Sequence, residues 1–177
     1  MKQRIARYSN QFKWLHWGIA VVVILLLSVS FFLEDFNATL KPTAIMLHKS
    51  FGLTVLILML IRLVWVIRTG RPALPKVMPY WEVLLARLVQ AAMYLGLITM
   101  ACIGWLMSTW ANRAPHFFGL FYLPIPGLSP NQAWAHWCFQ AHYILAWILI
   151  VLISLHVAGA LKHALIDRDK VMESMLP

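Results

Sequence analysis

The chain has 177 residues, of which 62% are hydrophobic and 12% are charged, and its mean hydropathy is +0.74. Soluble domains are about 45–50% apolar and about 25% charged, so the composition excludes an ordinary water-soluble protein and predicts one that lies in lipid. The formal net charge of +9 does not indicate a nucleic-acid-binding protein, because the Lys and Arg residues lie between apolar spans. The length suits a single membrane domain over 1–177, with no separate soluble domain.

Four segments are long and apolar enough to cross a bilayer, which takes about 20 mostly apolar residues. They cover 14–33, 45–67, 83–109 and 136–161. We interpret the first as a retained helix and not as a signal peptide, because its apolar run is long and no small-residue cleavage site follows it. The tail, 163–176, is typical of a short amphipathic helix on the membrane surface. The sequence therefore predicts an all-α integral membrane protein, a bundle of four transmembrane helices.

The basic residues are divided unequally between the two sides of the membrane. Twelve of the fifteen Lys and Arg residues fall at the N-terminus, around the second connection or in the tail. The other side has only Lys41, Lys49 and Arg113. By the positive-inside rule, both termini are expected in the cytoplasm and the first and third loops outside. The third loop, 111–134, is rich in proline and aromatic residues and is expected to fold over the outer end of the bundle.

Four of the seven histidines lie clearly inside the spans, whereas His136 is at the very edge of the fourth; ionisable residues inside a membrane are costly and indicate function. The four are His16, His48, His142 and His156. Chain direction puts His48 level with His142 near the outside, and His16 level with His156 near the cytoplasm. Fourteen residues separate His142 from His156, which corresponds to a rise of about 21 Å and a rotation of only about 40° in a helix. The fourth span therefore offers one ligand to each of two stacked sites.

Two b-type haems explain this pattern best. A low-spin haem takes two axial ligands on opposite faces, and neutral imidazole ligates iron without burying a charge. Small residues next to the ligands leave room for a flat ring: Gly52, Ala146, Gly159 and Ala160. Histidines that only hydrogen-bond helices together are the alternative, and His163 is the second choice for the cytoplasmic ligand. One zinc or copper site is disfavoured, because the histidines fall at two levels.

Several short motifs surround these histidines. They are Arg7-Tyr8, Leu15-His16-Trp17, 47–52, 62–65, His142 with His156, 160–163 and Arg168-Asp169. Together they resemble the prokaryotic cytochrome b561 family over nearly the whole chain. Related four-helix cytochromes serve as membrane subunits of formate dehydrogenases and nickel–iron hydrogenases.

This resemblance implies a di-haem b protein of the bacterial inner membrane that exchanges electrons with quinone. It implies that His48 and His142 hold the outer haem, and that His16 and His156 hold the inner haem. In this family superoxide in the periplasm can donate the electron and ubiquinone accepts it. The expected activity is therefore that of a superoxide:ubiquinone oxidoreductase.

Superoxide is an anion, so basic residues outside the cytoplasm are candidates for attracting it. Lys49, Arg113 and Lys41 are the residues available, and Lys49 is an equally good candidate for pairing with a haem propionate. The expected partners are superoxide, ubiquinone and the lipid bilayer, and not nucleic acid. Self-association or a redox partner subunit stays open.

Candidates for the quinone or for the edge of the inner haem are Arg7, Tyr8 and Asn10, although anchoring at the membrane interface explains these residues as well. Two other functions stay open. One is a cytochrome b subunit that takes electrons from a soluble dehydrogenase or hydrogenase subunit. The other is a structural membrane protein without a redox role.

Overall fold

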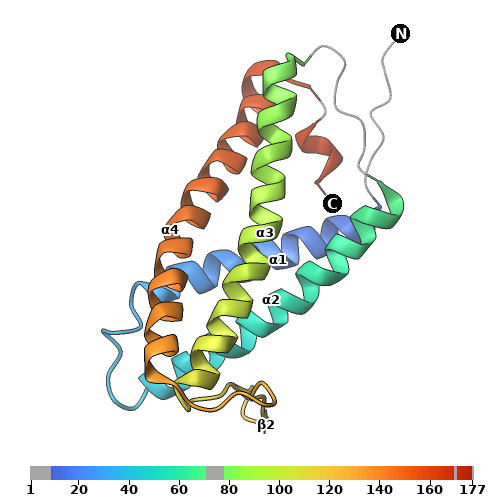
Figure 1. The fold of residues 1–177 in the computed structure, drawn as a ribbon. Coiled ribbons are helices and arrows are strands. Elements are labelled where there is room, and N and C mark those ends of the chain that lie inside the picture. The colour runs from blue at the N-terminus through green and yellow to red at the C-terminus, as the bar shows by residue number, and fades with distance from the viewer. Residues whose placement is uncertain (1–8, 71–77, 170, 177) are drawn as a thin grey trace.

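The computed structural model describes residues 9–70, 78–169 and 171–176. Four long helices account for most of this part of the chain: α1 (Asn10–Ser30), α2 (Lys41–Thr69), α3 (Tyr80–Trp110) and α4 (Gln132–Lys162). Each of them is long and apolar enough to cross a membrane. The main packing contacts join α1 to α2, α2 to α3 and α3 to α4, and Figure 1 shows α3 and α4 side by side. The predicted all-α, four-helix membrane fold is confirmed.

Three of the helices are longer than the apolar spans predicted from the sequence. α2, α3 and α4 have 29 to 31 residues, or about 45 Å at 1.5 Å per residue, whereas the hydrocarbon core is about 30 Å thick. They therefore continue past the apolar run at both ends. α1 has 21 residues and ends at Ser30, three residues before the predicted boundary.

A short hairpin covers one end of the bundle, which we call the hairpin end (Figure 1). Its strands are β1 (His116–Phe117) and β2 (Phe121–Tyr122). Ser50 of α2 is fully buried under it, and its hydroxyl accepts the Phe118 N–H at 2.9 Å. Trp105 of α3 donates its indole N–H to the Leu123 carbonyl at 2.7 Å. The third loop is thus bonded to two helices.

The opposite end, where the described chain finishes, is called the terminal end. Instead of one amphipathic helix over 163–176, the structure has a π-helical turn, η1 (His163–Asp167), and a 3-10 turn, η2 (Met172–Ser174). Arg168 lies between them with φ 49°, a left-handed conformation that ends a helix. The chain therefore reverses direction after α4.

The core lies between the two ends and draws on all four helices. Its buried members are Ile19, Val23, Val55, Met59, Leu97 and Leu149. Gly96 of α3 allows a close approach to α4, because a Cβ atom there would lie 2.9 Å from Leu149 Cδ2. Many large apolar side chains point outward instead, as expected for helices that face lipid.

Candidate functional site

The structure brings the four intraspan histidines together in two pairs. At the hairpin end, His48 of α2 faces His142 of α4, with ring centres 6.5 Å apart and ring planes at 67°. At the terminal end, His16 of α1 faces His156 of α4, with ring centres 6.2 Å apart and ring planes at 77°. All four side chains are half-buried. The pairs match those expected from depth along the chain.

These separations suit a single metal between each pair of rings. An imidazole nitrogen lies about 2 Å from a metal it ligates, with the ring centre roughly 1 Å farther out, so two opposed ligands have ring centres about 6 Å apart. Both ring planes contain the metal–nitrogen axis in such a complex. The steep angles between the planes are therefore compatible with ligation, because each ring is free to rotate about that axis.

Hydrogen bonds do not account for the hairpin-end pair. The buried Nδ1 atoms of His48 and His142 have no hydrogen-bond partner among the described residues. Buried polar atoms are normally satisfied, so these rings fit a ligand better than they fit a role in fastening helices together.

Arg62 of α2 contacts the terminal-end pair. Its Nη1 donates to His16 Nδ1 at 2.7 Å, and its guanidinium carbon lies 4.9 Å from the Phe12 ring centre and 5.6 Å from that of Tyr94. Arg62 belongs to the motif 62–65, but residue spacing did not predict its contact with His16. The sequence feature that could have indicated a role for Arg62 is its position as a single arginine in an otherwise apolar segment.

Glycines leave space around the histidines. A Cβ atom added at Gly52 or Gly159 would meet no atom within 4 Å, whereas one at Gly104 of α3 would lie 3.1 Å from His142 Cε1. Open space at Gly52 and Gly159 is compatible with a flat group beside the rings, and their role in making room for it stays a prediction. The contact between Gly104 and His142 was not predicted from the sequence. Because Gly104 has no side chain, the His142 ring can pack directly against α3.

At the hairpin end the structure also brings together two of the basic candidates. Lys49 Nζ donates to the Arg113 carbonyl at 2.8 Å. Among the described residues neither side chain forms an ion pair, whereas Lys41 pairs with Glu34. Lys49, the residue after His48, and Arg113 thus carry positive charge without an ion-pair partner among the described residues.

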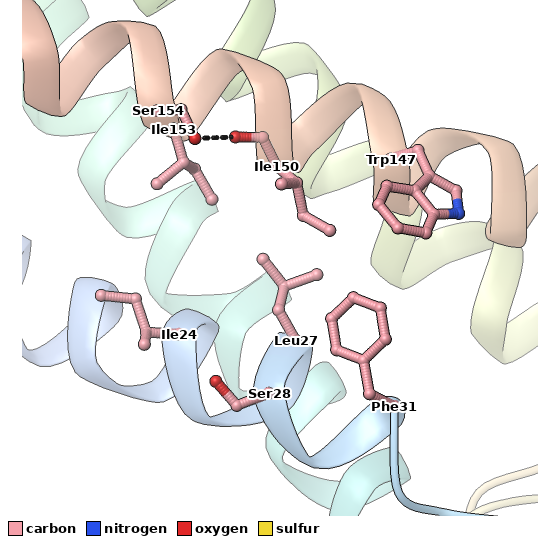
Figure 2. A pocket seen from close by; sticks show the side chains of 8 residues that line it. All are labelled: Ile24, Leu27, Ser28, Phe31, Trp147, Ile150, Ile153 and Ser154. Carbon is pink, nitrogen blue, oxygen red and sulfur yellow. Dashed lines mark hydrogen bonds between the residues drawn. The ribbon is translucent and has the colours of Figure 1, made fainter.

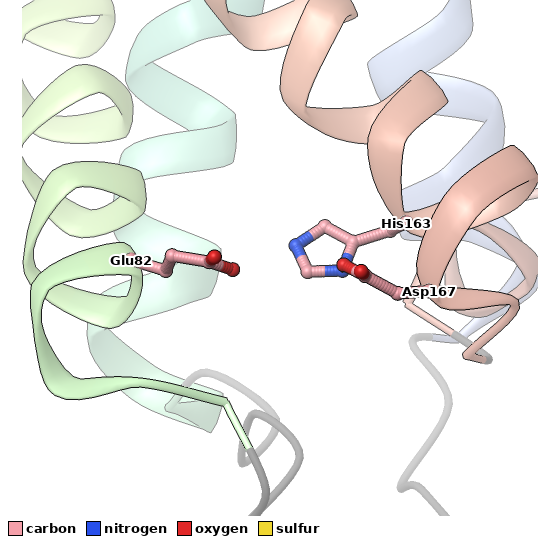
Figure 3. Close-up of side chains that lie close together, drawn as sticks. All are labelled: Glu82, His163 and Asp167. Atoms are coloured by element: carbon pink, nitrogen blue, oxygen red, sulfur yellow. The ribbon is translucent and has the colours of Figure 1, made fainter.

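The remaining candidates lie at the terminal end. Asn10 is the exposed first residue of α1, while Arg7 and Tyr8 lie outside the described residues. His163 does not face another histidine. Figure 3 shows it near Asp167 and Glu82, and its Nδ1 lies 2.8 Å from Asp169 Oδ2.

A cluster of charged side chains occupies this position. The ligand atoms of Glu82, His163 and Asp167 lie within 4.8 Å of one another, a spacing that would suit a metal. However, the Lys162 ammonium already binds Glu82 at 3.0 Å and Asp167 at 2.8 Å. We therefore interpret the cluster as an ionic link between α3 and the end of α4.

Comparison with known proteins agrees with this arrangement. The family described as prokaryotic cytochrome b561 matches residues 7–177. The chain belongs to the prokaryotic cytochrome b561 family. It is also 35% identical over 131 residues to cytochrome b561 homolog 2 of Escherichia coli strain K12, an alignment that covers 73% of this chain and 69% of that protein. This cytochrome b561 is thus a multi-pass bacterial membrane protein that binds haem b and takes part in electron transfer.

Proposed function

We propose that this cytochrome b561 holds two haem b groups and transfers electrons from periplasmic superoxide to ubiquinone. The two facing histidine pairs, with ring centres 6.2 and 6.5 Å apart, carry this proposal. When bound, each haem would supply an iron that gains and loses one electron reversibly. Two superoxide ions give up one electron each and become O₂, and one ubiquinone takes both electrons and two protons to become ubiquinol.

The histidines would hold the two haem irons, His48 with His142 and His16 with His156. A neutral imidazole that ligates through Nε2 keeps its proton on Nδ1. Arg62 is only a donor, so it would have to release His16 Nδ1 when that site is loaded. Its contacts with the Phe12 and Tyr94 rings can hold the guanidinium nearby.

Lys49 and Arg113 would attract superoxide to the hairpin end. A pair of cations without carboxylate partners among the described residues raises the local concentration of a small anion. Lys41 is a weaker candidate, because Glu34 offsets its charge. Lys49 also lies next to His48, where it can bind a carboxylate of the haem.

Ubiquinone would reach the bundle sideways from the lipid. Figure 2 shows an apolar groove between α1 and α4. It is lined by Ile24, Leu27, Ser28, Phe31, Trp147, Ile150, Ile153 and Ser154. On α4 these residues lie between His142 and His156, so the groove opens at a depth between the two pairs. It supports lateral access, while Asn10 with Arg7 and Tyr8 stays a prediction for the quinone itself.

The test combines a haem count with rapid kinetics. We expect two haems per chain in detergent, with spectra of two bis-imidazole sites. Mixing the oxidised protein with superoxide and ubiquinone should reduce the haem rapidly and yield ubiquinol. In Lys49→Gln the reduction should slow several-fold and depend less on ionic strength, whereas Arg68→Gln at the terminal end should leave the rate unchanged.

Other outcomes separate the alternatives. One haem per chain or none would contradict the pairing of histidines into two sites. Two haems that superoxide does not reduce would exclude superoxide as the donor. Reduction by a dehydrogenase or hydrogenase subunit that copurifies would then favour the membrane-subunit function.

A further inference from the structure

The residues after α4 return to the beginning of α1. We call residues 171–176 the C-terminal strap. Lys13 Nζ donates to the Leu176 carbonyl at 2.7 Å, and Trp17 Nε1 donates to the Met175 carbonyl at 2.9 Å. Lys13 and Trp17 are four residues apart, so they lie on one face of α1, and Figure 1 shows the end of the chain beside the terminal end of this helix.

The strap is also fixed where it leaves α4. Asp169 contacts His163 through Oδ2 and accepts the Val171 N–H through Oδ1 at 3.0 Å. Ser174 donates to the Val171 carbonyl at 2.6 Å and is only 8% exposed. The strap therefore links α4 to α1 through bonds at both of its ends.

The burial of Lys13 indicates that this link is specific. Lys13 is 5% exposed, although a lysine near a membrane surface normally extends its ammonium into water. An ammonium removed from water needs hydrogen bonds to offset its lost hydration, and the Leu176 carbonyl supplies one. The first turn of α1 contains no acidic residue that could do so instead.

The strap acts at the helices that carry the terminal-end histidines. His16 is on α1 and His156 is on α4, whereas the main packing contacts join α1 to α2 and α4 to α3. Trp17, which the strap binds, contacts His16 with ring centres 5.5 Å apart. Metal–ligand distances tolerate only about 0.2 Å of error, so the spacing of the two helices needs to be fixed at this level.

We propose that the C-terminal strap positions His16 opposite His156, with Lys13 and Trp17 as its anchoring residues. The inference rests on the proposed function only in that this pair holds haem. His48 and His142 do not contact the strap, so its removal should affect one site and spare the other.

The test uses Lys13→Met, Trp17→Phe and a chain that lacks 171–177. Trp14→Phe is the matched control, because Trp14 is on the same helix and 65% exposed. Hydrogen–deuterium exchange of the haem-free protein should show slow exchange in the strap of the wild type and of the control, and faster exchange in Lys13→Met and Trp17→Phe.

In the haem-loaded protein, redox titration and electron paramagnetic resonance should resolve the two haems. We expect the variants to weaken haem binding at the terminal end about 10-fold or more, as loss of outer contacts to a ligand does, and to shift the potential and low-spin signal of that haem alone. Fast exchange of the wild-type strap, or a released strap with both haem signals unchanged, would overturn the inference. Wild-type protein without two haems would instead refute the proposed function, and this inference with it.

Discussion

Facing imidazoles from different helices define the site at the scale of single residues. A histidine that only fastens helices together donates or accepts a hydrogen bond across the interface. Here, by contrast, His48 and His156 make no hydrogen bond with any side chain of the described residues, and each faces another ring instead. Two such pairs on one bundle suit two metal centres at different depths.

Substitution of the two α4 histidines should remove different haems. His142→Ala should cause loss of mainly the hairpin-end haem and His156→Ala loss of mainly the terminal-end haem, because each pair loses one of its two ligands. Haem content and low-spin signals of the purified variants measure this. His136→Ala is the control, since His136 is exposed on the same helix. Loss of the same haem in both variants would contradict the pairing by level.

Gly104→Ala should disturb the hairpin-end pair. The new methyl group would lie 3.1 Å from His142 Cε1 and 3.4 Å from its Nδ1, so the ring has to move by a few tenths of an ångström. We expect weaker haem binding at that level, although alanine favours a helix over glycine by about 1 kcal/mol.

Gly18→Ala is the matched control for this change. A Cβ atom at Gly18 would meet nothing within 4 Å, so this variant should bind both haems and unfold at the same temperature or slightly higher. Haem titration and thermal unfolding of both variants measure their haem affinities and unfolding temperatures for comparison. Equal haem affinity in Gly104→Ala and Gly18→Ala would show that the His142 ring tolerates the displacement.

The positions of the histidines could be predicted from the sequence, but their neighbours could not. Depth and rotation along a single helix follow from residue spacing, which is why His142 and His156 were assigned to two levels on one face. The contacts of Arg62 with His16 and of Gly104 with His142 depend on how separate helices rotate against each other. No spacing within one helix contains that information.

At the scale of the helices, α3 and α4 pack most extensively against each other. Gly96 on α3 lies against Leu149 on α4, and Leu149 is 1% exposed. Small residues let membrane helices approach each other closely. Leu149 lies halfway between His142 and His156, so this contact fixes α4 against the bundle between the two levels.

A double-mutant cycle tests this contact. Gly96→Ala alone should lower the free energy of unfolding by about 1–3 kcal/mol through overpacking, and Leu149→Ala alone by about 2–5 kcal/mol through the cavity it leaves. In the Leu149→Ala background, Gly96→Ala should cost little, because the clashing Cδ2 atom is gone. Unfolding in detergent, followed by tryptophan fluorescence, gives the coupling energy. Additive effects would show that the two residues do not compete for space.

Hydropathy predicts where the helices lie in the chain, but not the residues at which they begin and end. Hydropathy located all four spans, but α2 begins at Lys41 and α3 at Tyr80, because helical hydrogen bonding continues beyond the apolar run. The amphipathic pattern of the tail did not predict the strap. Its course depends on the left-handed Arg168 and on bonds to α1, about 160 residues away in the chain.

For the whole molecule, the distribution of charge sets the expected orientation. Lys49 and Arg113 lie at the hairpin end, and the ionic cluster around Lys162 lies at the terminal end. By the positive-inside rule we expect the terminal end in the cytoplasm and the hairpin end in the periplasm, on the side of the proposed donor.

Cysteine labelling of whole cells should confirm this orientation. In a background with Cys102→Ala and Cys138→Ala, Leu120→Cys in the hairpin should react with a membrane-impermeant maleimide from outside. Tyr80→Cys should react only after the membrane is opened. Both positions are highly exposed, at 74% and 81%, so access to solvent does not limit the reaction. The reverse pattern would invert the topology and place Lys49 in the cytoplasm.

Helix α4 contributes one histidine to each pair, His142 and His156. Inserting or deleting even one residue between them would therefore disrupt one of the pairs. An insertion between His142 and His156 would turn one imidazole about 100° away from its partner and lengthen the separation by about 1.5 Å. Homologous chains should therefore keep the fourteen-residue step and vary in length within the loop before α4. The number of residues between His142 and His156 on α4 therefore sets the distance between the two histidine pairs, and with it the distance over which an electron would be transferred.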